Sequence, residues 1–388
     1  MDCLIVDLAE RPGEPGNTML ADMGAALTSH GAAVTPILGK AGWEEGVAAF
    51  LSGLPANRRF LLIDGNCRAN KWVTDPRAVR FSFMVDHPAY RTNEFVGTSV
   101  GTIMGFVDES HLAAADLLKL PFPRLFFPHA GPPPADAVLP MAERSIDVLV
   151  CGNFGQALSD AEWRAAHPDV SEELAEPLLG AADHLATSLT TCLDAWIEAC
   201  ALCDFDTARI SPIELCRVLV AIETLAQARR RRDVLLGLAN HVAVHVIAGE
   251  LPTYLRGHPN VVELGAFTFS DVRRAFALTK VVINTVAKFA HGSHERIWYA
   301  MAAGCVVATD ESEFMSRYFS DGANFLILPW GTDQAQFRRH LAGLLRQPEE
   351  LDAMRVAARP IYERNHTWYQ RVTPLVELMR HIDRSSKE

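Results

Sequence analysis

The sequence predicts an α/β protein built from two Rossmann-like domains in series. In both halves of the chain, short apolar segments alternate with segments of helical pattern, which is typical of parallel sheets covered by helices. The proline-rich stretch Pro132-Pro133-Pro134 interrupts this alternation and marks a boundary. A chain of 388 residues is also long for a single hydrophobic core and sufficient for two.

An N-terminal domain is expected over residues 1–140. Its apolar runs are short and nearly continuous, as in strands that are buried on both faces of a sheet. Strands are expected at residues 4–8, 33–38, 60–63, 79–85, 99–107 and 125–127, with helices at 17–30, 43–51 and 110–119. This order of strand and helix favours a doubly wound sheet with helices on both faces.

A second α/β domain is expected over residues 141–358. It opens with the apolar run 146–151 and a glycine-containing turn, and a long helical region follows from about residue 160 to residue 228. Further strands are expected at 242–247, 261–264, 281–283, 306–308 and 325–328, and residues 356–382 are broadly helical.

The most informative segment of the chain runs from His291 to Asp310. It follows an apolar run at 281–284 and is expected to form a polar loop, a helix capped by Ser293, a stop at Gly304 and a second strand. The helix N-terminus offers unpaired N–H groups and a partial positive charge. Arg296 adds a full positive charge in the first turn, which the helix dipole alone would disfavour. A bound anion such as a phosphate would resolve this conflict.

This segment resembles the donor-binding region of GT-B glycosyltransferases, in particular the "glycosyl transferases group 1" C-terminal domain with its spore-maturation-type branch. Those proteins carry a loop, an arginine, a helix that ends in Ala-Met-Ala-x-Gly, and a strand. The matching residues here are Arg296, Ala300-Met301-Ala302 and Gly304, and residues 365–372 resemble a further segment near the end of related transferases. The resemblance implies two Rossmann-like domains that face a cleft, with the last helix, within residues 359–388, crossing back to the N-terminal domain.

The activity implied by this resemblance is transfer of a hexosyl or N-acetylhexosaminyl group from a nucleotide-diphosphate donor to a protein or surface-polysaccharide acceptor. A UDP-sugar is the favoured donor; it is a co-substrate, and no cofactor is expected. Many retaining members place glutamates where this chain has Tyr299 and His291. The stereochemistry therefore stays open, and a non-catalytic GT-B protein that binds a sugar nucleotide is the alternative. A GT-B epimerase would need cleft carboxylates that the sequence does not locate.

In a doubly wound sheet the ligand lies off the carboxyl ends of the strands. Gly152 would either let a diphosphate or sugar approach the backbone closely or merely serve a tight turn. Lys288 and Arg296 are the basic candidates for the diphosphate, and the resemblance favours Arg296. Glu295 would either bind ribose or sugar hydroxyls or be an ordinary first-turn acid. The expected donor-binding residues are Gly152, Asn153, Lys288, His291, Gly292, Ser293, His294, Glu295, Arg296 and Asp310.

Acids and histidines at the strand ends of the N-terminal domain are candidates for the base that takes the acceptor proton. Asp86 and His87 follow one strand, and Pro88 holds His87 extended, so we expect the base to be Asp86 or His87. His111 and His129 are acceptor-side candidates at neighbouring strand ends, although a lone histidine is more often structural.

Charge, hydropathy and missing motifs argue against nucleic-acid-binding, membrane-spanning and dinucleotide-dependent proteins. The net charge of −11 argues against nucleic acid as a partner, because phosphate contacts need a basic face. No apolar run approaches the roughly 20 residues that span a bilayer, so the protein is not expected to be transmembrane. The N-terminus lacks the basic region of a signal peptide, and a cytoplasmic protein is expected. Neither a dinucleotide-binding glycine fingerprint nor a Walker loop is present in the sequence.

Three further motifs are interpreted as structural. Asp204-Phe205-Asp206 matches the Asp-x-Asp metal signature of the other large glycosyltransferase fold, but it follows a helical segment and not a strand. No metal site is expected, because fixed positive groups do the work of an ion. Cys200 and Cys203 form a lone Cys-x-x-Cys pair and are expected to be core residues. The run from Arg229 to Arg232 would either bind an anionic surface or form a solvated face at a junction between two helices, and the solvated face is expected because the chain is acidic.

Overall fold

The computed structural model describes residues 1–8, 15–331 and 334–385. The chain divides into two compact units: unit 1 comprises Met1–Pro133 and Tyr362–Glu388, and unit 2 comprises Pro134–Ile361. Residues 134–140, expected in the N-terminal domain, belong to unit 2, where the backbone N–H of Ala135 donates to the carbonyl of Ala302 (2.9 Å).

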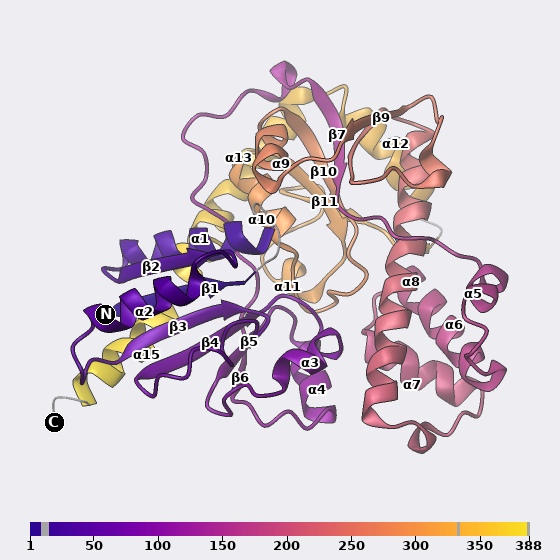
Figure 1. Ribbon diagram of the computed structural model, residues 1–388. Helices are drawn as coiled ribbons and strands as arrows, with labels where there is room; N and C mark the ends of the chain where they lie inside the picture. The colour runs from indigo at the N-terminus through magenta and orange to yellow at the C-terminus, as the bar shows by residue number, and fades with distance from the viewer. Residues whose placement is uncertain (9–14, 332–333, 386–388) are drawn as a thin grey trace. The chain divides into compact units, whose positions relative to one another are not determined.

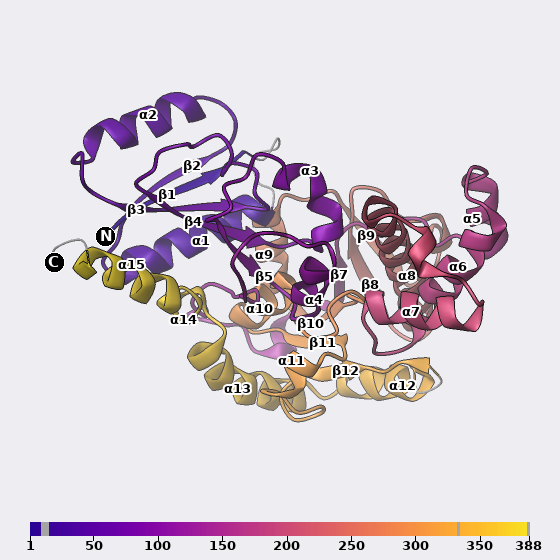
Figure 2. The same cartoon turned by 90° about the horizontal axis from the view of Figure 1, so that it is seen from below.

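Unit 1 contains a six-stranded parallel sheet with the strand order β2-β1-β3-β4-β5-β6. Its strands are β1 (Asp2–Asp7), β2 (Ala33–Leu38), β3 (Phe60–Gly65), β4 (Ala78–Met84), β5 (Ile103–Phe106) and β6 (Arg124–Phe126). Alternate residues of β1 face opposite layers, because Leu4 packs with Val47 of α2 (Trp43–Gly53) whereas Ile5 faces Gly24 of α1 (Pro15–Ser29). Figure 2 shows α2 and α1 on opposite faces of this sheet.

Unit 1 also includes the C-terminal segment of the chain. The backbone N–H of Trp368 donates to the carbonyl of Gly131 (2.8 Å), and its indole packs edge-on against Phe83 with the ring centroids 5.6 Å apart. The remaining helices of this unit are α3 (Thr92–Phe95), α4 (Ser110–Leu117), α14 (Trp368–Arg371) and α15 (Thr373–Ser385). The last helices therefore belong to the unit of the N-terminal sheet, as the resemblance implies.

Unit 2 contains a second six-stranded parallel sheet, with the order β12-β11-β10-β7-β8-β9 (Figure 1). Its strands are β7 (Ile146–Cys151), β8 (Val244–Ile247), β9 (Val261–Gly265), β10 (Thr279–Asn284), β11 (Val306–Asp310) and β12 (Leu326–Leu328). The chain order reverses between β7 and β10, which makes their carboxyl ends the switch point of this sheet. The two sheets confirm the predicted pair of Rossmann-like domains.

The helical region expected at 160–228 is a set of separate helices. It comprises α5 (Asp160–Ala166), α6 (Glu172–Thr187), α7 (Cys192–Leu202) and α8 (Pro212–Ala239). Ser211 and Glu214 form a capping box at the start of α8, with Pro212 at its first position, and the helix then continues through the arginine run. The other helices of unit 2 are α9 (Phe269–Ala277), α10 (Glu295–Ala302), α11 (Glu313–Ser316) and α12 (Gln334–Leu344). Helix α13 (Pro348–Asn365) begins in unit 2, and its residues from Tyr362 on belong to unit 1. Within residues 1–8, 15–331 and 334–385, no helix has the length and apolar character needed to cross a bilayer.

Candidate functional site

The candidate site lies at the switch point of unit 2, and its first element is Gly152. Gly152 directly follows β7 with φ 137°, a conformation that L side chains rarely adopt. A Cβ atom at this position would lie 2.9 Å from Nη2 of Arg296, closer than real Cβ contacts allow. The glycine therefore makes room for the guanidinium of Arg296 at the end of β7, in addition to shaping the turn.

Arg296 is held by the last residue of β10, which is itself bonded to β11. Its Nη1 donates to Oδ1 of Asn284 at the end of β10 (3.1 Å), and Nδ2 of Asn284 donates to Oγ1 of Thr309 in β11 (3.0 Å). In the described part of the chain no carboxylate forms an ion pair with Arg296. Its charge is thus presented at the strand ends without a counter-ion. Sequence reasoning missed Asn284, although a polar residue that closes an apolar strand was a usable signal.

The helix cap differs from the prediction. Ser293 is not the N-cap of α10; His294 is, and its ring Nδ1 accepts from the backbone N–H of Arg296 (3.3 Å). Ser293 is buried, and its Oγ accepts from the indole Nε1 of Trp298 (3.0 Å), a donor that needs a partner in the interior. Gly304, which follows the C-cap Ala303, has φ 74°, as expected for a glycine that ends a helix.

The pKa of His294 is strongly shifted by its surroundings. Its Nδ1 lies 2.9 Å from Oε2 of Glu295. Burial lowers the pKa of His294 to about 4, assisted by Arg296 and Lys288 and opposed by Glu295. The imidazole is therefore neutral at pH 7 and acts as a hydrogen-bonding cap.

Three of the four arginines in the run are buried, which corrects the predicted solvated face. The run lies within α8, and Arg229, Arg230 and Arg231 are each less than 9% exposed. Arg229 pairs with Asp160 (2.7 Å) and Asp183 (2.5 Å) of the preceding helices. The prediction failed because a charge run is usually solvated, whereas α8 is covered on several sides.

Arg231 reaches the same strand ends as Arg296. Its Nη1 donates to the carbonyl of Asn153, and its Nε donates to Oγ1 of Thr285 (3.3 Å), the residue after β10. Burial, followed by the nearby charge of Arg296, lowers the pKa of Arg231 to about 10. A usable signal was its helical register, since Leu235 and Leu238, four and seven residues later, pack on the sheet.

Asp310 and Lys288 lie in ion pairs with α8. The carboxylate of Asp310 is buried and accepts from Nη2 of Arg230 (2.8 Å) and from the backbone N–H of Val286 (2.7 Å). Nζ of Lys288 lies 3.6 Å from the buried carboxylate of Glu223. Both pairs anchor the loop between β10 and α10, and neither presents a free charge comparable to that of Arg296.

The other predicted residues of this loop are engaged with the segment after β11. Nδ1 of His291 lies 3.0 Å from Oε2 of Glu313, and the carbonyl of Gly292 accepts from Oγ of Ser312 (2.6 Å). Tyr299 is buried against Phe269, with ring centroids 5.0 Å apart. At the two positions where many retaining members of the family that the segment resembles carry glutamates, this chain has a histidine–carboxylate pair and a packed tyrosine.

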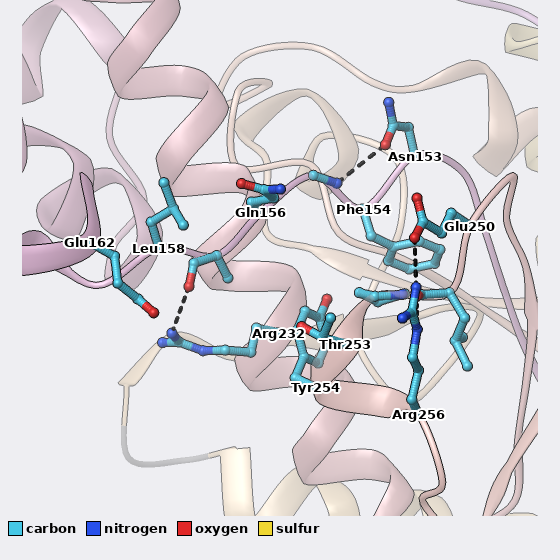
Figure 3. A pocket seen from close by; sticks show the side chains of 14 residues that line it. Asn153, Phe154, Gln156, Leu158, Glu162, Arg232, Glu250, Thr253, Tyr254 and Arg256 are labelled. Atoms are coloured by element: carbon cyan, nitrogen blue, oxygen red, sulfur yellow. Dashed lines mark hydrogen bonds and ion pairs between the residues drawn. The ribbon is translucent and has the colours of Figure 1, made fainter. Parts of the chain in front are cut away.

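A pocket of about 560 Å³ adjoins Asn153, as Figure 3 shows. The loop after β7, the loop after β8 and α8 form its wall, and its polar side chains include Asn153, Gln156, Glu162, Arg232, Glu250, Thr253, Tyr254 and Arg256. Arg256 pairs with Glu250 (2.6 Å), and Oδ1 of Asn153 accepts from the backbone N–H of Gly155 (3.2 Å) (Figure 3). A volume of this size is typical of small-molecule sites.

In unit 1 the structure brings Asp86 and His87 into a bonded cluster. Asp86 pairs with Arg91 and accepts from Nδ2 of Asn66 (3.0 Å), a residue in the left-handed region with φ 54°. His87 is buried, its Nδ1 accepts from the backbone N–H of Ala89 (3.2 Å), and its ring meets that of His111 edge-on (4.9 Å).

The remaining histidine and the Asp-x-Asp motif lie elsewhere. His129 is buried beside Phe83 (5.4 Å between ring centroids), in the packing that also holds Trp368. Asp206 follows α7 and accepts from the backbone N–H of Ala208 (3.0 Å) as a helix cap. Among residues whose placement is described, no three histidine, cysteine or acidic side chains are grouped to hold a metal ion. Cys200 is buried, whereas Cys203 is exposed.

Comparison with known proteins finds one family match over part of the chain. Residues 221–377 match the sequence profile of the family described as glycosyl transferase-like. The match begins inside α8 and includes the arginine run, the loop after β10 and α10. No curated protein matches the sequence significantly.

Solved structures similar to this chain include glycosyltransferases and a sucrose-phosphate synthase. An α-glucosyltransferase in complex with UDP-glucose and DNA containing an abasic site has a TM-score of 0.54 at 10% identity, covering 98% of this chain and 99% of that chain. Sucrose-phosphate synthase from Thermosynechococcus elongatus gives 0.51 at 13% identity, covering 99% of both chains. HepE from Anabaena in complex with UDP-glucose gives 0.51 at 12% identity, covering 98% and 100%. At these identities the likeness establishes the GT-B fold.

Proposed function

We propose that this protein is a glycosyltransferase that takes a sugar from a nucleotide-diphosphate donor bound by unit 2. The observation that carries the proposal is the guanidinium of Arg296, placed against Gly152 at the switch point without a carboxylate partner in the described residues. The match of residues 221–377 to a glycosyl transferase-like family supports it. A diphosphate would supply the negative counter-charge that Arg296 lacks, and the partial positive charge at the N-terminus of α10 would also attract it.

The same groups would assist the reaction. As the glycosidic bond breaks, negative charge grows on the departing diphosphate, and a fixed guanidinium at that point stabilises it without reorganisation. The pocket beside Asn153 would take the nucleoside, and the UDP-glucose bound in the α-glucosyltransferase and HepE complexes favours UDP as the nucleotide. The acceptor would be a protein or a surface polysaccharide.

For the base that takes the acceptor proton, we favour Asp86 over His87. The side chain of Asp86 is 28% exposed, whereas His87 is buried and its Nδ1 is already an acceptor for Ala89. The carboxylate is held by Arg91 and Asn66, which would orient it toward an acceptor hydroxyl.

The direct test is incubation with a panel of UDP-, GDP-, dTDP- and CMP-sugars, with binding and slow hydrolysis both measured. Hydrolysis of one donor would identify it and establish turnover. Absence of binding to every donor in the panel would overturn the proposal.

The alternative is a GT-B adaptor that binds a sugar nucleotide without turnover. The observation that favours it is Tyr299, which occupies a position of a common catalytic-site glutamate but is buried against Phe269. Binding of a donor without hydrolysis, and without transfer to protein or polysaccharide acceptors, would support this alternative.

Transfer is expected to be insensitive to metal chelation, because arginine side chains supply the positive charge at the switch point. Activity should be unchanged by EDTA. Activity that disappears with EDTA and returns with Mn²⁺ would contradict this prediction and make Asp204 and Asp206 candidate ligands.

A further inference from the structure

Arg231 is an unusual buried charge. A buried guanidinium normally lies beside a carboxylate, because burying an unpaired ion costs several kcal/mol. In the part of the chain that the structure describes, Arg231 forms no ion pair and bonds to the neutral oxygens of Asn153 and Thr285. The nearby carboxylate of Asp310 is already bonded to Arg230 and to the backbone of Val286.

The free-energy cost of burying the charge of Arg231 is increased by a second positive charge nearby, that of Arg296. Asn153 follows β7 and Thr285 follows β10, so the guanidinium joins the two loops that flank the switch point. Arg296 reaches the same point from α10, where it meets Gly152. Two like charges are thus held together at the place where a doubly wound sheet binds its ligand.

We infer that Arg231, which belongs to α8, supplies a second positive charge for the diphosphate of the donor, in addition to the charge that Arg296 supplies from α10. The inference rests on the proposed function and deepens it. A guanidinium has five N–H donors, and the hydrogen bonds to Asn153 and Thr285 use three of them, so two remain for phosphate oxygens. Binding of an anion with two negative charges would neutralise Arg231 and Arg296 together.

A purely structural role predicts different behaviour. If Arg231 only joined the loops of Asn153 and Thr285, anion affinity would depend on its hydrogen bonds to these loops and not on its charge. Arg231→Lys keeps the charge and loses the fork of donors, Arg231→Gln keeps donors and loses the charge, and Arg231→Met loses both. The order of anion affinity among these three variants therefore separates the two roles.

The experiment measures binding of inorganic pyrophosphate, UDP and uridine to the full chain by calorimetry, at two salt concentrations. We expect Arg231→Gln and Arg231→Met to weaken pyrophosphate and UDP by roughly 10- to 100-fold, with uridine unchanged and Arg231→Lys in between. The matched control is Arg229→Met, which removes two ion pairs from the same helix without touching the strand ends; it should lower the unfolding midpoint and leave pyrophosphate affinity unchanged.

Wild-type affinity for UDP in Arg231→Gln would overturn the inference while leaving the proposed function intact. Equal losses for Arg231→Lys and Arg231→Met, or equal losses of UDP and uridine, would also overturn it, since both indicate a structural role. A wild-type protein that binds neither pyrophosphate nor any nucleoside diphosphate would instead overturn the proposed function.

Discussion

At the scale of single residues, Gly152 and Arg296 form the central pair of the site. The missing side chain of one makes room for the guanidinium of the other, with only 2.9 Å between Nη2 and the position of a Cβ atom. The sequence indicated both residues separately, Gly152 as a strand-end glycine and Arg296 as a first-turn cation. Their contact could not be predicted, because it joins residues 144 positions apart (296 − 152) across two strand ends.

The pair makes a double-mutant prediction. Arg296→Ala should cost about 1.5–3 kcal/mol of nucleoside-diphosphate affinity, because it removes a charge-assisted contact. Gly152→Ala should also weaken binding, since the new methyl group displaces the guanidinium and the backbone at φ 137° disfavours alanine. The two losses should not add in the double variant, which titration of all four proteins would measure. Additive losses would mean that the two residues act independently.

At the scale of elements, α8 organises unit 2. Four consecutive arginines in this helix bond to α5, α6, β11 and the loops after β7 and β10. Arg229 binds α5 and α6, Arg230 binds β11, Arg231 joins the loops after β7 and β10, and Arg232 bonds to the carbonyl of Ala157 (3.4 Å). Figure 1 shows the length of this helix relative to its neighbours. A run of arginines can lie in the interior of a unit only when the surrounding elements supply carboxylates and carbonyls that accept its hydrogen bonds.

The pair Arg230–Asp310 allows a stability test of this element. Arg230→Met should lower the free energy of unfolding by about 3–5 kcal/mol, because it leaves a carboxylate buried without its partner. The double variant Arg230→Met with Asp310→Leu should be more stable than the single one, since it removes both charges. Urea unfolding of the wild type and the variants would measure these differences. A double variant less stable than the single one would show that the loop after β10 depends on Asp310 itself.

The elements also show what sequence patterns can predict. The central strands were predicted within a few residues, because a parallel strand buried on both faces is an apolar run that needs no knowledge of its neighbours. Gly152 and Arg296 were expected at strand ends of the second domain, whereas the strand order, and with it the switch point between β7 and β10, was not predicted. The roles of Ser293 and the arginine run were missed, since the partner of Ser293 is an indole five residues later and the partners of Arg230 lie 80 and more residues away. Such partners are fixed by tertiary packing alone.

At the scale of the whole molecule, each unit contains a histidine whose pKa burial lowers, His294 in unit 2 and His366 in unit 1. In unit 1, burial and then Arg371 lower the pKa of His366 to about 3, and this side chain is fully buried. The folded state therefore keeps it neutral, whereas the unfolded chain binds a proton below about pH 6.5. Stability contributed by this group is present above pH 6.5 and is lost as the pH falls toward 3.

The contribution of His366 to acid sensitivity can be measured with His366→Gln. The free energy of unfolding of the wild type should fall by up to about 1.4 kcal/mol per pH unit below pH 6.5 through this residue, in addition to the fall that other groups cause. The variant, which cannot take up the proton, should show a shallower dependence by that amount in urea unfolding between pH 7 and pH 4. Parallel curves for the two proteins would contradict the assignment.

The proposed division of labour between the units yields the last prediction. If Asp86 takes the acceptor proton, Asp86→Asn should lower turnover by a factor of about 10² to 10⁴, because base catalysis acts in the transition state. Nucleotide affinity should stay at the wild-type value, since the residues proposed to bind the donor belong to unit 2.

His87→Gln and His111→Gln test the neighbouring imidazoles, and a larger loss of turnover in either variant would assign the base to that histidine. His129→Ala should act on stability more than on turnover, because His129 packs with Phe83 in the core of unit 1. Unchanged turnover in all four variants would favour a mechanism in which a donor phosphate oxygen takes the acceptor proton.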